Sequence, residues 1–310
     1  MIGIADIAYV VPPQRVDNAP RAERLGVPLA TLDRRIGVRR VARRAAEQDT
    51  SDLAVAAAEA LFARGTVERD RVECLVVVTQ NPDGRGLPHS SALVHARLGL
   101  EPDCAVFDIG LGCSGYVYGL SIVSSFMQAN GLRQGLLITA DPYSKIVDPD
   151  DKRTALLFGD GAAATLLNDQ PKWRLGRFDF GTEGRRADSL KVDAGSGRLF
   201  MDGRAILQFS MGVVPRSLRR ALDLNGLSPQ QIDRVVLHQG SRVVVENIGE
   251  ALGLADRTQF HATDYGNTVS SSIPIVLADH LLPQDRHVAL SGFGVGLSWA
   301  STVLSRVPAP

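Results

Sequence analysis

Short runs of consecutive apolar residues alternate along the chain with longer segments in which apolar residues recur at helical spacing. The short runs are rich in valine and isoleucine and are too short for helices, so they are typical of strands buried on both faces. We therefore predict strands at 2–11, 72–80, 135–141 and 232–238. A strand interrupted by a glycine turn is expected at 156–167, and one long strand over 287–304.

The longer segments carry helix signals. They predict helices at 51–64, at 90–98, from about Ser114, over 201–222 with a proline interruption, and at 241–252. Ser51 or Asp52 is the expected N-cap of the first of these helices, and Gly65 its stop. Because strands and helices alternate, the pattern indicates an α/β protein.

The second half of the chain repeats the design of the first. The spacing Ala60-Leu61…Gly65 recurs as Ala221-Leu222…Gly226, and each copy precedes a linker and a valine-rich strand. The segment "LFGDGAAATLL" likewise corresponds to "GFGVGLSWASTVL". We predict a duplicated α/β unit with an N-terminal half at 1–168 and a C-terminal half at 169–310.

Composition excludes several classes of protein. Lysine and arginine total 34, as do aspartate and glutamate, so no charge excess favours nucleic acid or a membrane surface. The N-terminus lacks the pattern of a signal peptide, and no apolar run is long enough to span a membrane. Three scattered cysteines fit the reducing cytoplasm, and the cysteines and histidines lack zinc-site spacing, so no metal or other cofactor is expected.

Cys113 lies in the stretch that organises this picture, "FDIGLGCSGYVYGL". A short strand runs into the turn Gly110-Leu111-Gly112, and an apolar helix follows Cys113. Free backbone N–H groups and the dipole at a helix N-terminus favour an anion, so we expect a lowered thiol pKa and a nucleophilic role. The alternative from these residues alone is a buried cysteine that packs the start of a helix.

Two further polar residues occupy comparable positions in the second half. His238 follows a buried strand in "VLHQGS", and Asn267 lies in the turn of "DYGNTVSSSIP". In α/β folds such positions face the ligand crevice, where a thiolate could accept an acyl group while an imidazole and an amide donate to a developing oxyanion. Each residue taken alone also has a purely structural interpretation: His238 could cap a strand, and Asn267 could be a left-handed turn residue.

Six segments in order resemble β-ketoacyl-acyl-carrier-protein synthase III of the thiolase superfamily. They are "DIGLGCSGYVYGL", "LFGDGAAATLL", "MDGRAILQFSM", "VVLHQGS", "YGNTVSSSIP" and "GFGVGLSWAS". The resemblance implies a five-layered αβαβα thiolase-like fold of two similar halves, usually as a homodimer. It also implies a catalytic triad of Cys113, His238 and Asn267.

The resemblance further implies a reaction and its partners. An acyl group would pass from acyl-CoA or acyl-carrier protein to Cys113. A malonyl thioester would then lose CO2, and its enolate, stabilised by His238 and Asn267, would attack the acyl thioester. The backbone N–H groups of Cys113 and Val295 would form the oxyanion hole, although Val295 replaces a family glycine and narrows the pocket.

The implied substrate-binding positions depart from the family more than the triad does. By resemblance they are Arg35, Leu87, Lys152, Leu207, Gln208 and Ser241. Leu87 would reach into the partner's acyl pocket, whereas its alternative is an exposed loop leucine. Thr31 stands where the family has an adenine-stacking tryptophan, and Gln208 where it has a phosphate-binding lysine. The donor is therefore expected to be an unusual acyl-CoA or an acyl-carrier protein, as in relatives from secondary metabolism.

The sequence leaves two other functions open. The acyl group on Cys113 could pass to an alcohol or amine, as in some relatives resembling synthase III. Alternatively, the chain could be the catalytically silent subunit of a heterodimeric condensing enzyme, although an intact triad argues against this. A reverse-acting thiolase is disfavoured, because that family has a second cysteine where this chain reads "SGFGVG".

Overall fold

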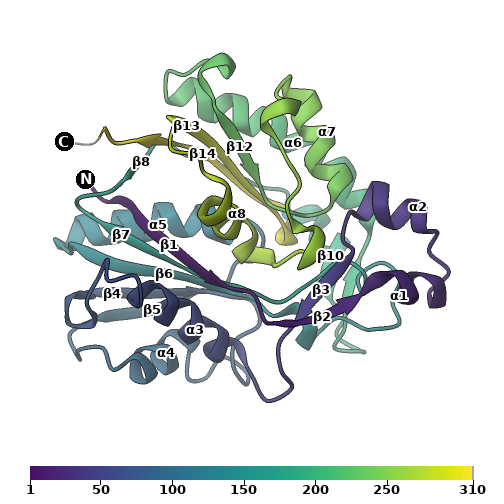
Figure 1. Ribbon diagram of the computed structural model, residues 1–310, viewed down its shortest axis with the longest axis horizontal. Helices are drawn as coiled ribbons and strands as arrows, with labels where there is room; N and C mark the ends of the chain where they lie inside the picture. The colour runs from purple at the N-terminus through teal and green to yellow at the C-terminus, as the bar shows by residue number, and fades with distance from the viewer. Residues whose placement is uncertain (309–310) are drawn as a thin grey trace.

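The computed structural model describes residues 1–308 and has five alternating layers of helices and sheets (Figure 1). Ten strands of the described chain form one hydrogen-bonded sheet, which divides into two parts. The last two residues of the predicted second half lie outside the described residues. No helix within residues 1–308 is long and apolar enough to cross a membrane.

The first part of the sheet comes from the N-terminal segment of the chain. Its strand order is β5 (Ala105–Ile109), β4 (Cys74–Val78), β6 (Gln134–Ala140), β7 (Ala162–Asn168) and β1 (Gly3–Val10). The strands β4, β5 and β6 are parallel, and β7 is antiparallel to both β6 and β1. The residues of β4 are all buried and apolar, and those of β6 are nearly all buried, as predicted, whereas the edge strand β5 is mostly half-buried and contains Asp108.

The second part comes from the C-terminal segment. It consists of β12 (Arg234–Leu237), β13 (His287–Gly294) and β14 (Ser298–Arg306), with β9 (Asp179–Thr182) beside β14. The short strand β8 (Trp173–Leu175) pairs with both β1 and β14 and so joins the two parts. Two small antiparallel pairs of strands lie outside this sheet, β2 (Gln14–Asp17) with β3 (Arg40–Arg43) and β10 (Leu190–Val192) with β11 (Leu199–Met201).

Helices form the outer and central layers. The central layer is α5 (Gly115–Asn130) and α8 (Ser272–His280), each of which packs against strands of both sheet parts. The outer helices are α3 (Thr50–Phe62) and α4 (Ser90–Leu98) on the N-terminal part, and α6 (Gly203–Leu224) and α7 (Arg242–Leu252) on the other (Figure 1). The short helices α1 (Asn18–Arg24) and α2 (Leu29–Thr31) precede a π-helical turn at Leu32–Ile36.

Three local predictions are corrected. Asp49, not Ser51 or Asp52, is the N-cap of α3, because it forms a capping box with Asp52 at the third helical position. The predicted strand at 287–304 is a hairpin, since residues 295–297 turn the chain between β13 and β14. The segment 156–167 is extended only from Ala162, where β7 begins.

The proline interruption predicted in 201–222 also differs. The helix α6 runs from Gly203 through Pro215 to Leu224 without ending. Pro215 lacks a backbone N–H and so removes one helical hydrogen-bond donor, but it is buried and the helix continues past it for nine residues to Leu224.

Candidate active site

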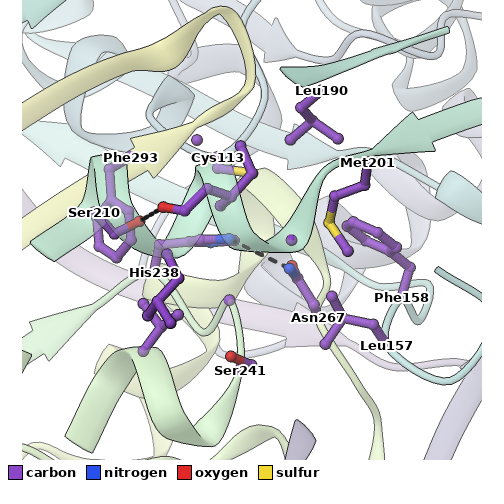
Figure 2. A pocket seen from close by; sticks show the side chains of 16 residues that line it. Cys113, Leu157, Phe158, Leu190, Met201, Ser210, His238, Ser241, Asn267 and Phe293 are labelled. Carbon is purple, nitrogen blue, oxygen red and sulfur yellow. Dashed lines mark hydrogen bonds between the residues drawn. The ribbon is translucent and has the colours of Figure 1, made fainter. Parts of the chain in front are cut away.

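A narrow pocket with a cavity volume of about 90 Å³ opens between the two sheet parts. Figure 2 shows that its side chains converge from several segments far apart in the sequence, and that most of them are apolar. These segments are loops before or after strands and helices, the strands β10, β11 and β13, and the outer helices α6 and α7. The lining includes Cys113, Leu157, Phe158, Leu190, Met201, Leu207, Ser210, His238, Ser241, Asn267 and Phe293. The three residues of the expected triad therefore share one cavity.

Cys113 lies between the end of β5 at Ile109 and the start of α5 at Gly115. It is 4% exposed, and glycines of the facing strand β13 leave the space for it. A Cβ atom on Gly294 would lie 2.8 Å from the Cys113 sulfur, which is too close for two unbonded atoms. The backbone N–H groups of Val295 and of Cys113 itself are directed at the sulfur.

The expectation of a lowered thiol pKa is wrong. Burial raises the pKa of the Cys113 thiol to about 12, although the two backbone N–H groups oppose the shift. The nearby carboxyl group of Asp141 raises it further. The Cys113 thiol is therefore neutral in the pocket. The backbone N–H groups of Val295 and Cys113 could stabilise a negative charge beside it.

Asp141 is a buried acid near Cys113 that was not predicted from the sequence. Its Oδ1 accepts hydrogen bonds from the backbone N–H of Gln80 at 3.1 Å and from Nδ2 of Asn81 at 3.0 Å. Its Oδ2 is buried without a hydrogen-bond partner. Burial accordingly raises the pKa of Asp141 to about 7.

His238 directly follows β12, and its backbone N–H continues the ladder by donating to the carbonyl of Ser291 at 2.9 Å. Its ring is almost fully buried and stands edge-on to the ring of Phe293, with 5.7 Å between ring centroids. Burial lowers the pKa of His238 to about 3, so the ring is neutral near pH 7. The Nδ1 atom lies 2.8 Å from Oγ of Ser272.

Asn267 is held by backbone bonds to the segment before β7. Its N–H donates to the carbonyl of Leu157 at 2.9 Å, and its carbonyl accepts from Gly159 at 3.0 Å. Gly159 is required here, because a Cβ atom would lie 1.8 Å from the carbonyl oxygen of Tyr265. The Asn267 side chain places Nδ2 3.3 Å from Nε2 of His238, the contact drawn as a dashed line in Figure 2.

Gly266 and Val269, not Asn267, are the left-handed residues of this turn. Val269 has φ 53° although it is β-branched and fully buried, a conformation that costs about 1–3 kcal/mol. Its N–H donates to Oδ1 of Asn267 at 2.8 Å. The strained backbone thereby turns the amide nitrogen of Asn267 toward His238.

The expected substrate-binding residues separate into two groups. Leu207 and Ser241 line the pocket beside the triad. Arg35, Lys152 and Gln208 are exposed, and Leu87 is 93% exposed; none of these four lines the pocket, and Val295 does not line it either. The apolar wall includes residues that the sequence analysis did not single out, namely Leu157, Phe158, Leu190, Met201, Ile206, Val244 and Phe293.

Comparisons with known proteins agree with this site. Residues 107–184 match the family model described as 3-oxoacyl-[acyl-carrier-protein (ACP)] synthase III, and residues 222–306 match the model of its C-terminal part. The β-ketoacyl-[acyl-carrier-protein] synthase III of Streptococcus equi subsp. zooepidemicus is 31% identical over 97% of this chain and 98% of that relative.

Solved structures give the same result. A crystal structure of a 3-oxoacyl-(acyl-carrier-protein) synthase III superposes with a TM-score of 0.92 at 35% identity, covering 98% of this chain and 99% of the other. The synthase III of Pseudomonas aeruginosa PAO1 gives a TM-score of 0.90 at 32% identity, covering 99% of this chain and 98% of the other. The predicted thiolase-like fold and the resemblance seen in six segments are therefore confirmed, and this chain belongs to the 3-oxoacyl-[acyl-carrier-protein] synthase III family of condensing acyltransferases.

Proposed function

We propose that this protein forms a carbon–carbon bond by decarboxylative condensation, with Cys113 as nucleophile and with His238 and Asn267 as stabilisers of an enolate. The observation that supports this most strongly is the shared pocket, in which one thiol, one imidazole and one amide meet inside an otherwise apolar wall. Charges that develop there are poorly screened by water, so correctly placed donors have a large effect on the rate.

In the first proposed step, the sulfur of Cys113 forms a bond to the acyl carbon of an acyl-CoA or acyl-carrier-protein donor. The bond between that carbon and the donor sulfur breaks, and the donor leaves as a thiolate. Between these two events the acyl carbon is tetrahedral and its oxygen carries a negative charge. The backbone N–H groups of Cys113 and Val295 would stabilise this charge. These N–H groups belong to the backbone, so the valine at position 295 does not remove a donor.

In the second proposed step, a malonyl thioester binds on the side of His238 and Asn267. Its carboxylate leaves as CO2, and the bonding electrons move into an enolate whose oxygen lies between the imidazole and the amide. The enolate carbon then attacks the acyl group on Cys113, and the cysteine sulfur is released. Asn267 suits this role because its Oδ1 is engaged by Val269, which leaves Nδ2 as a donor.

The direct test combines purified protein, an acyl donor and a malonyl thioester carrying labelled carbon in its free carboxyl group. The proposal predicts one CO2 released for each 3-oxoacyl thioester formed. Transfer of the acyl group to an alcohol or amine without CO2 would support the rival acyltransferase. A protein that forms an acyl-cysteine only after a second subunit is added would support a heterodimer.

We also propose that the protein acts as a homodimer. The strand β5 ends the sheet path, so one of its edges is unpaired within the described chain. Beside it lies a continuous patch of half-buried or exposed side chains, Phe107, Tyr118, Ile122, Phe126, Phe178 and Phe180. A second copy would cover this patch, and the exposed Leu87 is then free to enter the partner's acyl pocket.

The proposal also includes the domain boundary and the location of the protein. The boundary between the two halves at 168 and 169 is supported by the end of β7 at Asn168, after which β8 leads into the second sheet part. A cytoplasmic location is supported by the three free cysteines, since that compartment keeps thiols reduced.

The remaining expected substrate-binding residues would contact the acyl donor. Arg35, Lys152 and Gln208, which are exposed, would contact its outer part, and Leu207 and Ser241 its inner end.

A further inference from the structure

Ser272 is the side chain that contacts the inner nitrogen of the His238 imidazole, and a backbone hydrogen bond to Val269 also acts on this ring and raises its pKa. Ser272 is the first residue of α8, it is fully buried, and its Oγ lies 2.8 Å from Nδ1 of His238. A neutral imidazole has one N–H, so this contact bears on which ring nitrogen carries the proton.

The hydrogen bonds around Ser272 assign that proton. Oγ of Ser272 lies 2.9 Å from the carbonyl oxygen of Val269, to which only the hydroxyl proton can be donated. With its own proton used there, Oγ is an acceptor, and Nδ1 of His238 must be the donor. The backbone N–H of Gln239 also points at this oxygen, at 3.4 Å.

The other ring nitrogen gives the same answer. Nε2 of His238 lies 3.3 Å from Nδ2 of Asn267. Because Oδ1 of Asn267 is engaged by Val269, the group facing the ring is the amide NH2, which is a donor. An N–H on Nε2 would oppose it, whereas a lone pair on Nε2 accepts from it. With the proton on Nδ1, every one of these buried polar groups has a partner.

We propose that Ser272 is a positioning residue that fixes the proton of His238 on Nδ1 in the free enzyme, so that Nε2 receives the proton of the Cys113 thiol during acylation. Cys113 and His238 are the two titratable residues that line the pocket, so Nε2 is the base available to the buried thiol there. This inference rests on the proposed role of Cys113, but the position of the imidazole proton does not.

The proton balance over one cycle is closed. The S–H bond of Cys113 breaks, its proton bonds to Nε2, and the Cys113 sulfur bonds to the acyl carbon while the donor leaves as a thiolate. The imidazolium then has an N–H on each side, one toward Ser272 and one toward the enolate oxygen beside Asn267. When condensation breaks the acyl–sulfur bond, the cysteine thiolate takes the proton back.

The test uses three variants of the full-length protein. Ser272→Ala removes the hydroxyl, and Ser272→Thr retains it. Ser271→Ala is the matched control, because Ser271 is equally buried but bonds to Thr139 and Gly161 and not to His238. The ¹⁵N signals of His238, assigned by their loss in His238→Gln, report which nitrogen is protonated, and the rate of Cys113 acylation is measured at saturating donor.

In the wild type, in Ser271→Ala and in Ser272→Thr we expect a protonated Nδ1 and similar acylation rates. Ser272→Ala should lose the Nδ1–H signature, and its maximal acylation rate should fall at least tenfold with little change in the donor concentration for half-saturation. A wild type protonated on Nε2, or a Ser272→Ala protein that acylates normally, would overturn the proposal. If no donor acylates the wild type, the proposed function fails, and the ¹⁵N signals still decide the role of Ser272.

Discussion

The backbone N–H of Val269 donates to Oδ1 of Asn267 at 2.8 Å, and this one bond decides which end of the amide faces His238. Val269 adopts φ 53° to make it. A buried valine holds this conformation only because the surrounding packing requires it. The strained backbone of Val269 thus fixes the orientation of the Asn267 side chain.

Removing the amide nitrogen of Asn267 should therefore separate the two proposed steps. In Asn267→Ala the donor that faces His238 is removed, so enolate stabilisation is lost, while the proposed contact of Ser272 with Nδ1 remains. We expect CO2 release to fall roughly 100- to 1000-fold, while Cys113 acylation changes less than fivefold. The matched control is Asn247→Ala on α7, outside the pocket lining. Equal losses in both steps would contradict separate roles.

The glycine opposite the nucleophile gives a steric test. A methyl group in Gly294→Ala would meet the Cys113 sulfur at 2.8 Å and its Cβ at 2.7 Å. Gly294 ends the packed strand β13 and Cys113 lies in the buried turn before α5, so neither can move away easily. We therefore expect acylation to fall at least 100-fold and the melting temperature to drop. Gly212→Ala in α6 is the control, since no atom lies within 4 Å of its new methyl group. Normal acylation by Gly294→Ala would refute the close approach.

Removing the charge of Asp141 should change the pH at which the Cys113 thiol becomes reactive. The carboxyl group raises the pKa of Cys113, so removing its negative charge favours the thiolate. The Asp141→Asn variant retains an oxygen for the N–H groups of Gln80 and Asn81. Its rate of alkylation by iodoacetamide should rise at a lower pH than in the wild type. Asp103→Asn, which changes an exposed aspartate near Cys104, should leave that profile in place.

The buried imidazole predicts acid destabilisation. The pKa of His238 is about 3 when folded and 6.5 when exposed, so below pH 6.5 the unfolded chain binds a proton that the folded one does not. Stability is present above pH 6.5 and is lost as the pH falls toward 3. Between pH 7 and pH 5 the loss from this one group is about 2 kcal/mol. Urea unfolding of His238→Gln should show a correspondingly smaller loss, and an equal loss would contradict the assignment.

The apolar patch beside β5 predicts the effect of a single charge on assembly. Ile122 on α5 is 39% exposed in the single chain. In a homodimer, Ile122→Glu would bury an unpaired carboxylate, so the variant should elute as a monomer at concentrations where the wild type is dimeric. Leu282→Glu changes a leucine that is 42% exposed outside the patch, and it should leave the dimer intact. Identical elution of all three proteins would contradict this interface.

The fold was predictable from residue patterns to a considerable extent. The buried strand β4 and the helix α4 appear where valine runs and helix signals indicated them. The hairpin of β13 and β14 was missed although its turn at 295–297 contains Gly296 at φ 75°, because Val295 and Leu297 on either side continue the apolar run. The N-cap of α3 was missed because Ser51 and Asp52 are also good capping residues.

The site was predictable only where a residue type by itself indicates chemistry. Cys113, His238 and Asn267 could be assigned to one site because each has a reactive or hydrogen-bonding side chain and follows a strand or a turn. The raised thiol pKa could not be predicted, since it arises from burial by distant segments such as 157–158 and 292–295. Ser272 stands in a run of three serines, and only the folded chain shows which of them reaches the imidazole.

The most direct measurement is the intact mass of the protein after incubation with acyl-CoA and acyl-carrier-protein donors, with Cys113→Ala beside the wild type. The account predicts that at least one donor adds the mass of its acyl group to the wild type and not to the variant. An acyl group that remains in Cys113→Ala, or a wild type that no donor labels, would contradict the claim that Cys113 is the nucleophile.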